Sequence, residues 1–150
     1  MSFAVMVLDA PRKVAMRPLI LWLWVAGVMQ SVILAANFAL PKKLRCRENL
    51  ARVSPMIREV FIVHWLYIVL VIGIFISLCF WFTPELAGTS RLGRFLSAAM
   101  AGFWMLRVPI QLFIYDPEIR RQNRLADITF LLIFLYLSVV FSAAALGAFQ

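Results

Sequence analysis

Four apolar segments, each long enough to cross a lipid bilayer, dominate this 150-residue sequence. A helix needs roughly 20 mostly apolar residues to cross the hydrocarbon core of a membrane. The apolar segments predict such helices at about residues 18–40, 60–82, 95–115 and 128–149. Because only short connections join them, the sequence predicts an all-α fold: a single membrane domain, built as an integral bundle of four transmembrane helices.

The composition is typical of a chain that is dissolved in lipid. Hydrophobic residues make up 64% of it, whereas a soluble domain is about 45–50% apolar. A chain this short cannot bury so much apolar surface inside itself. The net charge of +8 comes mostly from Lys and Arg residues between the apolar segments. That distribution favours membrane orientation over a basic face for nucleic acid, so we expect the lipid bilayer, and no nucleic acid, as a partner.

Proline and small polar residues mark the expected ends of the first two helices. Pro18 suits the first turn of the first span, and Pro41 is expected to end that span. Ser54 followed by Pro55 predicts that the second helix begins before the bilayer, and Thr83-Pro84 is expected to close it. The first span could instead be a signal peptide, although its apolar core exceeds the usual length of about 7–15 residues.

Similar signals bound the second half of the chain. Thr89 or Ser90 can cap the third helix, and Asp116-Pro117-Glu118 reads as a cap, a proline and an acidic first turn. No Gly or Pro interrupts residues 118–146. We therefore predict one long final helix whose first turns project into water.

The distribution of Lys and Arg predicts the orientation in the membrane. The first loop carries six of these residues and the third loop three, while the N-terminal segment carries three and the second loop two. Cytoplasmic loops are enriched in Lys and Arg. We expect the first and third loops in the cytoplasm and both termini outside, in a bacterial inner membrane. Cys46 and Cys79 should then lie near opposite faces, too far apart to form a disulfide.

Polar side chains inside the spans are the candidates for function, because such residues are costly in lipid. Arg107 lies well inside the third span, with Gln111 one turn further on the same face. His64 lies about one turn inside the second span, followed by Tyr67. Gln30 and Asn37 share one face of the first span, seven residues apart, and Thr129 and Tyr136 do likewise on the fourth.

These eight residues could meet in the cytoplasmic half of the bundle, and two interpretations remain open. They could form hydrogen bonds between helices, or they could line a ligand-binding pocket for a quinone, a chlorophyll-type pigment or a lipid headgroup. In either case we expect Arg107 and Gln111 to point toward His64 or Tyr67. Separately, Ala98 and Gly102 form a pair of small residues that permits close helix approach.

Several kinds of chemistry lack the residues they need. A single histidine excludes haem ligated by two histidines, and no cluster of His, Cys and carboxylates predicts a zinc or di-iron site. No catalytic Ser–His–Asp arrangement can be assigned. A proton-coupled transporter would carry a buried Asp or Glu in the membrane, whereas the acids here lie outside the spans or at their edges. We therefore predict no catalytic residue and no metal site.

Four short stretches resemble known proteins. They are residues 64–70, 92–97, 103–107 and 111–116, which read HWLYIVL, LGRFLS, FWMLR and QLFIYD. These stretches are similar to those of uncharacterised bacterial four-helix integral membrane proteins. The resemblance covers roughly residues 60–141 and implies a fold without implying an activity.

Three functions follow as hypotheses. The first is a non-enzymatic accessory or assembly subunit of a larger membrane complex, with other membrane protein subunits as partners. The second is a membrane protein that binds a quinone, pigment or lipid headgroup near His64 and Arg107. The third is a lipid-modifying membrane enzyme in which Arg107 binds a phosphate.

Overall fold

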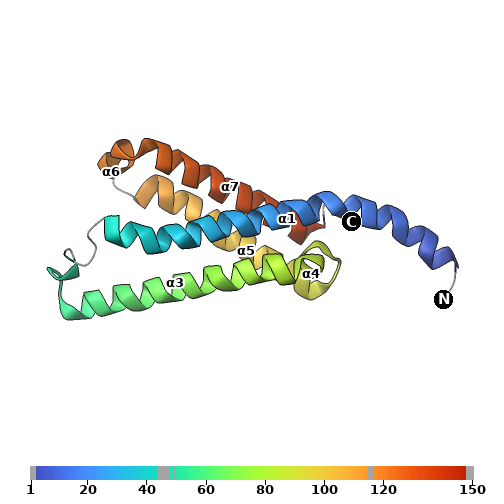
Figure 1. Ribbon diagram of the computed structural model, residues 1–150, viewed down its shortest axis with the longest axis horizontal. Coiled ribbons are helices and arrows are strands. Elements are labelled where there is room, and N and C mark those ends of the chain that lie inside the picture. The colour runs from blue at the N-terminus through green and yellow to red at the C-terminus, as the bar shows by residue number, and fades with distance from the viewer. Residues whose placement is uncertain (1–2, 44–47, 49, 115–116, 148–150) are drawn as a thin grey trace.

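The protein is an all-helical bundle (Figure 1). The computed structural model describes residues 3–43, 48, 50–114 and 117–147, and no strand occurs in these segments. Cys46, Tyr115, Asp116 and the expected end of the last span at 149 lie outside them. The elements are α1 (Phe3–Lys43), α3 (Pro55–Trp81), α4 (Thr83–Ala87), α5 (Arg91–Pro109), the π-helical turn η1 (Ile110–Ile114), α6 (Pro117–Gln122) and α7 (Arg124–Leu146).

Four helical segments are long and apolar enough to cross a membrane, as the sequence predicts. They are Arg17–Ala39 in α1, Pro55–Trp81 in α3, Arg91–Ile114 in α5 with η1, and Arg124–Leu146 in α7. The first span agrees with the expected bounds within one residue. α3 begins at Pro55, five residues before the expected span, as Ser54-Pro55 predicts. Its 27 residues reach about 40 Å, which is longer than a hydrocarbon core of about 30 Å.

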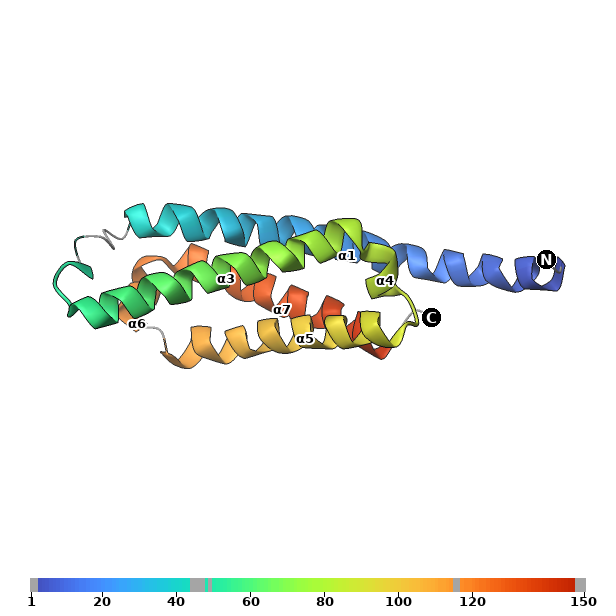
Figure 2. The ribbon, with the colours of Figure 1, turned by 90° about the horizontal axis from the view of Figure 1, so that it is seen from below.

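The four long helices lie lengthwise beside one another, and each connection lies at one end of the bundle (Figures 1 and 2). The connection from α1 to α3 and the short helix α6 lie at the same end. Helix α4 and the C-terminal end of α7 lie at the opposite end, beyond which the N-terminal part of α1 projects. The two most basic connections of the sequence are therefore brought to one end of the molecule.

The bundle is built from two helix pairs. α5 packs along α7, and α1 packs along α3, while α1 also contacts α7 and joins the pairs. The pair α1–α3 is close at Gly27, where an added Cβ would lie 3.0–3.1 Å from atoms of Phe80 and Cys79. Apolar side chains from all the long helices fill the centre. The largest buried side chains of this core are Trp104, Phe141, Leu19, Leu23, Leu86, Met100 and Leu137.

The predicted ends of the first helix are wrong. α1 begins at Phe3 and continues through Pro18, and it also continues past Pro41 to Lys43. Each proline removes one backbone hydrogen bond from a helix, but neighbouring helices can satisfy the carbonyl that is left without a donor. At Pro41 this occurs: the Asn37 carbonyl, four residues earlier, accepts a hydrogen bond from Nε1 of Trp65 in α3 at 3.3 Å.

The predicted starts of the second and third helices are confirmed. Pro55 occupies the first turn of α3 directly after Ser54, although the Ser54 side chain makes no capping hydrogen bond. At the start of α5, the Ser90 hydroxyl accepts from the Gly93 N–H at 3.0 Å. Gly93 is required here because an added Cβ would lie 2.0 Å from the Glu85 carbonyl oxygen.

The predicted single long helix at the end of the chain is divided in two. α6 ends at Gln122, Asn123 adopts φ −122° and ψ 39°, and α7 begins at Arg124. Neither glycine nor proline produces this break. The break lets Arg120 of α6 turn back and form an ion pair with Asp127 of α7. In a continuous helix these residues, seven positions apart, would be separated by about 10 Å along the axis. α7 ends at Leu146, and Gly147, whose φ of 70° is left-handed, caps it.

Candidate functional site

The polar residues at the end of α5 are positioned by a proline. Pro109 has no N–H, so the helix cannot continue with its regular bonds, and the N–H of Ile110 bonds instead to the carbonyl of Arg107. A π-helical turn, Ile110–Ile114, follows. Such turns often occur at functional sites. Here the wider turn places the Gln111 side chain in the interior, where it is 6% exposed.

Gln111 takes part in a hydrogen-bonded cluster that joins three elements, which we term the polar clip: Gln111, Leu112, Arg120 and Asp127. The Gln111 amide donates to Asp127 Oδ1 at 2.6 Å. Arg120 donates to both carboxylate oxygens of Asp127 from Nε, at 3.2 and 3.1 Å, and from Nη2 at 3.0 Å. Nη1 of Arg120 donates to the Leu112 carbonyl at 3.0 Å. The clip therefore ties η1 and α6 to the start of α7.

Two interactions of Arg120 hold the polar clip together, an ion pair with Asp127 and a hydrogen bond to a backbone carbonyl. The Arg120 guanidinium forms an ion pair with Asp127, and both side chains are mostly shielded, with 26% and 13% exposed. Charged, bidentate bonds of this kind are stronger than neutral ones. The Leu112 carbonyl lies in the π-helical turn, and its partner five residues on would be Pro117, which has no N–H. Arg120 thus supplies this carbonyl with a hydrogen-bond donor from another element.

Arg107 lies one turn before this clip and contacts α7. Its guanidinium carbon lies over the ring of Phe134, 5.6 Å from the ring centre. The ring of Phe134 also stacks on that of Trp104 at 5.6 Å, with an angle of 19° between the planes. A cation over an aromatic face is attracted by the negative charge of the π system. Arg107, which is half-buried, is thus held on the α5–α7 side of the bundle.

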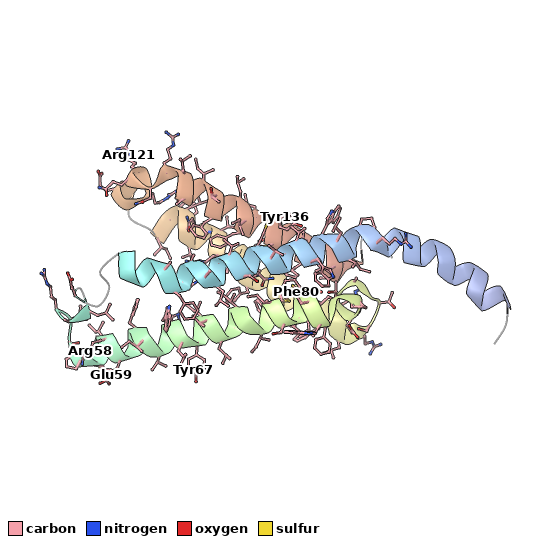
Figure 3. The ribbon with its side chains drawn as sticks, in the orientation of Figure 1. Arg58, Glu59, Tyr67, Phe80, Arg121 and Tyr136 are labelled. Carbon is pink, nitrogen blue, oxygen red and sulfur yellow. The ribbon has the colours of Figure 1, made fainter. Side chains whose placement is uncertain are left out.

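The expected meeting of Arg107 and Gln111 with the second span does not occur. Both contact α7, whereas His64 and Tyr67 are exposed on α3. Tyr67 is 62% exposed, and Figure 3 shows it pointing away from the bundle. The physical reason is the pairing of helices, because α5 packs along α7 while α3 packs on α1. The predicted orientation toward His64 or Tyr67 is therefore wrong.

Tyr136, Asn37 and Thr129, which are also predicted site residues, lie apart from one another in the bundle. Tyr136 donates from its hydroxyl to the Trp22 carbonyl at 3.1 Å, which joins α7 to α1. The Asn37 amide donates to the Ile33 carbonyl of its own helix at 2.9 Å. Thr129 is exposed. The eight residues thus do not converge on one pocket; they lie in several places along the helices.

Gln30 is fully buried between α1 and α3. Its amide nitrogen donates to the Ala26 carbonyl at 3.2 Å and to Sγ of Cys79 at 3.3 Å. Within the described residues, its Oε1 has no hydrogen-bond partner, and neither has Nε1 of Trp104. No sequence pattern connects Gln30 with Cys79, since a cysteine inside an apolar run carries no signal that identifies its neighbours.

Some of the contacts had a signal in the sequence. Pro41 leaves the carbonyl of residue 37 without its helical donor, so a donor from another helix is required there; Trp65 supplies it. Asp127 lies at the edge of the fourth span, and Gln111 lies near the corresponding end of the third span, so the two lie near the same membrane face in the predicted topology. No comparable signal identifies Arg120 as the partner of Asp127, because the break at Asn123 has no proline or glycine.

Metal-binding residue types are not clustered in the part of the chain that is described. His, Cys, Asp and Glu residues there form no group of three that could hold a metal ion. A groove of about 650 Å³ lies elsewhere, where it is lined by α1 and α3 and includes Leu34, Phe38 and Gly73. No protein family model, no curated protein and no solved structure matches the chain.

Proposed function

We propose that the protein is a non-enzymatic accessory or assembly subunit of a larger membrane complex, and that a partner membrane protein packs against its α3–α5 side. The observation that carries this proposal is the uneven packing of the bundle. In an apolar 18-residue stretch of α3, 6% of the residues are buried inside the chain, against 33%, 28% and 33% in the corresponding stretches of α1, α5 with η1, and α7. α3 is thus held mainly by α1 and leaves most of its surface for a neighbour.

The outward face of α5 supports the same proposal. The small residues Ala98 and Gly102, which permit close helix approach, are exposed. An added Cβ at Gly102 would meet no atom within 4 Å. Phe95 and Leu106 lie above and below this pair and are 69% and 63% exposed. The chain itself does not use this close-packing surface, so we assign it to a partner helix.

The proposal includes an orientation and a location. Both basic connections lie at one end of the bundle (Figure 1), which supports a cytoplasmic position for that end. With this orientation both termini lie outside, in the inner membrane of a bacterium. The quinone and pigment hypotheses required His64 and Arg107 to share a pocket, and the separation of these two residues on α3 and α5 favours the accessory role instead.

The test is purification of the tagged chain from its native membrane in mild detergent, followed by identification of co-purifying membrane proteins. Gly102→Leu adds bulk to the proposed contact without an internal clash. Val139→Leu is the matched control, since Val139 is 66% exposed on α7. We expect Gly102→Leu to reduce the recovery of one specific partner at least fivefold, and Val139→Leu to leave it unchanged. Equal recovery with both variants, or no stoichiometric partner, contradicts the proposal.

A further inference from the structure

The groove between α1 and α3 is open at the surface and is lined by residues along both helices. It begins between Phe38 and Leu34 of α1 and Val69 of α3, and it follows α3 to Phe82. Val69 and Phe82 are thirteen residues apart, which corresponds to about 20 Å along the helix. One leaflet of hydrocarbon is about 15 Å thick. The groove is therefore long enough for a lipid acyl chain that lies along α3.

The floor of the groove is open and apolar. Gly73 contributes no side chain, and an added Cβ there would meet nothing within 4 Å. Ser77 lies one turn further, and its hydroxyl already donates to the Gly73 carbonyl at 2.9 Å. The polar group in the lining is thus occupied within its own helix, so the groove offers a hydrocarbon surface rather than hydrogen-bonding groups.

The near end of the groove lies at the depth of a membrane interface. Phe38 contacts the ring of Trp65 edge-on at 5.5 Å, and it lies one residue before the end of the span in α1 at Ala39. Tryptophan is enriched where the hydrocarbon meets the headgroups. A lipid chain that enters at Phe38 would thus place its headgroup just beyond Trp65, beside the connection from α1 to α3.

That connection is strongly basic. Residues 41–59 contain six Lys and Arg residues and two acidic residues, Glu48 and Glu59. Among the side chains that the structure describes, Arg52 and Arg58 are exposed, and Figure 3 shows Arg58 at the same end of the bundle. Arg58 precedes Trp65 by seven residues, which places its backbone about 10 Å further out. The headgroup layer is about 5–7 Å thick, and a long arginine side chain can turn back toward it.

We propose that this groove is a binding site for an anionic glycerophospholipid, with one acyl chain along Gly73 and Ser77 and the phosphate at the end of the bundle that carries Arg52 and Arg58. The apolar groove selects the acyl chain, and the charge of the connection selects an anionic headgroup over a zwitterionic one. The site lies on the α1 side of α3 and does not depend on the accessory role, because the isolated chain carries all of it.

The experiment uses the full chain purified in detergent and incubated with phosphatidylglycerol or phosphatidylcholine of identical acyl chains. Native mass spectrometry measures the retained lipid. We expect a preference for phosphatidylglycerol that falls roughly fivefold for each arginine removed in Arg52→Gln and Arg58→Gln. Gly73→Leu fills the groove from an open position, so both lipids should be lost. Gly102→Leu, the same change on α5, should have no effect.

Three outcomes overturn the proposal. They are equal retention of the two lipids by the unaltered chain, unchanged retention in Gly73→Leu, or an unchanged preference in Arg52→Gln and Arg58→Gln. If Gly73→Leu leaves the lipid unchanged but alters the oligomeric state, the groove is assigned to a second helix. Arg52 lies in the connection and Arg58 in the first turn of α3, and both are exposed, so their variants keep the test decisive if Gly73→Leu does not fold. The experiment contains no partner protein, so a negative result concerns lipid binding alone. The accessory role is tested separately by co-purification.

Discussion

Trp65 of α3 donates a hydrogen bond from Nε1 to the backbone carbonyl of Asn37 in α1, at 3.3 Å. That carbonyl has no donor in its own helix, because Pro41 stands where the N–H would be. The ring of Trp65 also contacts Phe38 edge-on at 5.5 Å. The indole of Trp65 thus replaces the donor that the proline removes. Asn37, a predicted site residue, takes part in this contact through its backbone carbonyl.

This match predicts a coupling between Trp65 and Pro41. Trp65→Phe keeps an aromatic ring but removes the donor, and we expect it to lower the stability in detergent by roughly 0.6–2 kcal/mol, the range for hydrogen bonds between membrane helices. Pro41→Ala restores the N–H of the helix. In the Pro41→Ala background, Trp65→Phe should lower the stability by clearly less than it does in the unaltered chain, because the helix then supplies its own donor to the Asn37 carbonyl. Thermal unfolding of the four proteins in one detergent measures the cycle, and strictly additive effects would contradict the coupling.

Two glycines on α5 should respond in opposite ways to the same change. Gly93→Ala places a Cβ 2.0 Å from the Glu85 carbonyl oxygen, so we expect a loss of more than about 2 kcal/mol or failure to fold. Gly102→Ala meets nothing within 4 Å and should be neutral or stabilising by up to about 1 kcal/mol. Size-exclusion profiles and thermal unfolding distinguish the two. A tolerated Gly93→Ala would show that α4 and α5 are not packed as described.

The polar clip should hold α6 against the bundle. Asp127→Asn removes the negative charge that Arg120 binds, and it leaves Arg120 with a weaker neutral acceptor. We expect a stability loss of about 1 kcal/mol, since the pair is partly exposed to solvent. Hydrogen exchange of α6 should rise more than that of the α7 centre. Arg121→Gln is the control, because Arg121 is exposed and points away from the bundle in Figure 3; equal exchange in both variants refutes the clip.

The orientation can be tested with the chain's own cysteines. Cys79 is fully buried, so an impermeant thiol reagent should reach Cys46 in the basic first loop before it reaches Cys79. If that loop lies in the cytoplasm, intact cells should protect Cys46 until the membrane is opened. Cys46→Ser should abolish the labelling and provide the background. Rapid labelling of Cys46 in sealed cells would place the first loop outside and reverse the proposed topology.

Much of the fold was predictable because its signals are local. The length of an apolar run decides whether a helix can cross the hydrocarbon, and Ser90 before α5 and Pro55 at the start of α3 act on neighbouring backbone groups. The continuation of α1 through Pro18 and Pro41 was not predictable in this way. A proline ends a helix in water, but in a bundle a neighbour such as Trp65 can supply the missing donor.

The sequence by itself thus determined the four membrane-spanning helices, the basic character of two connections and most helix starts. Only the tertiary structure decided which faces meet: Gln111 on Asp127, Arg107 on Phe134, Gln30 on Cys79, and neither Arg107 nor Gln111 on His64. The physical reason is the solvent. In water, the apolar stripe of a helix identifies its buried face, whereas lipid is as apolar as the interior of the bundle, so the faces toward lipid and toward other helices look alike in sequence. The rotation of each helix about its axis is then set by close packing and by a few polar contacts, which exist only when the helices are together.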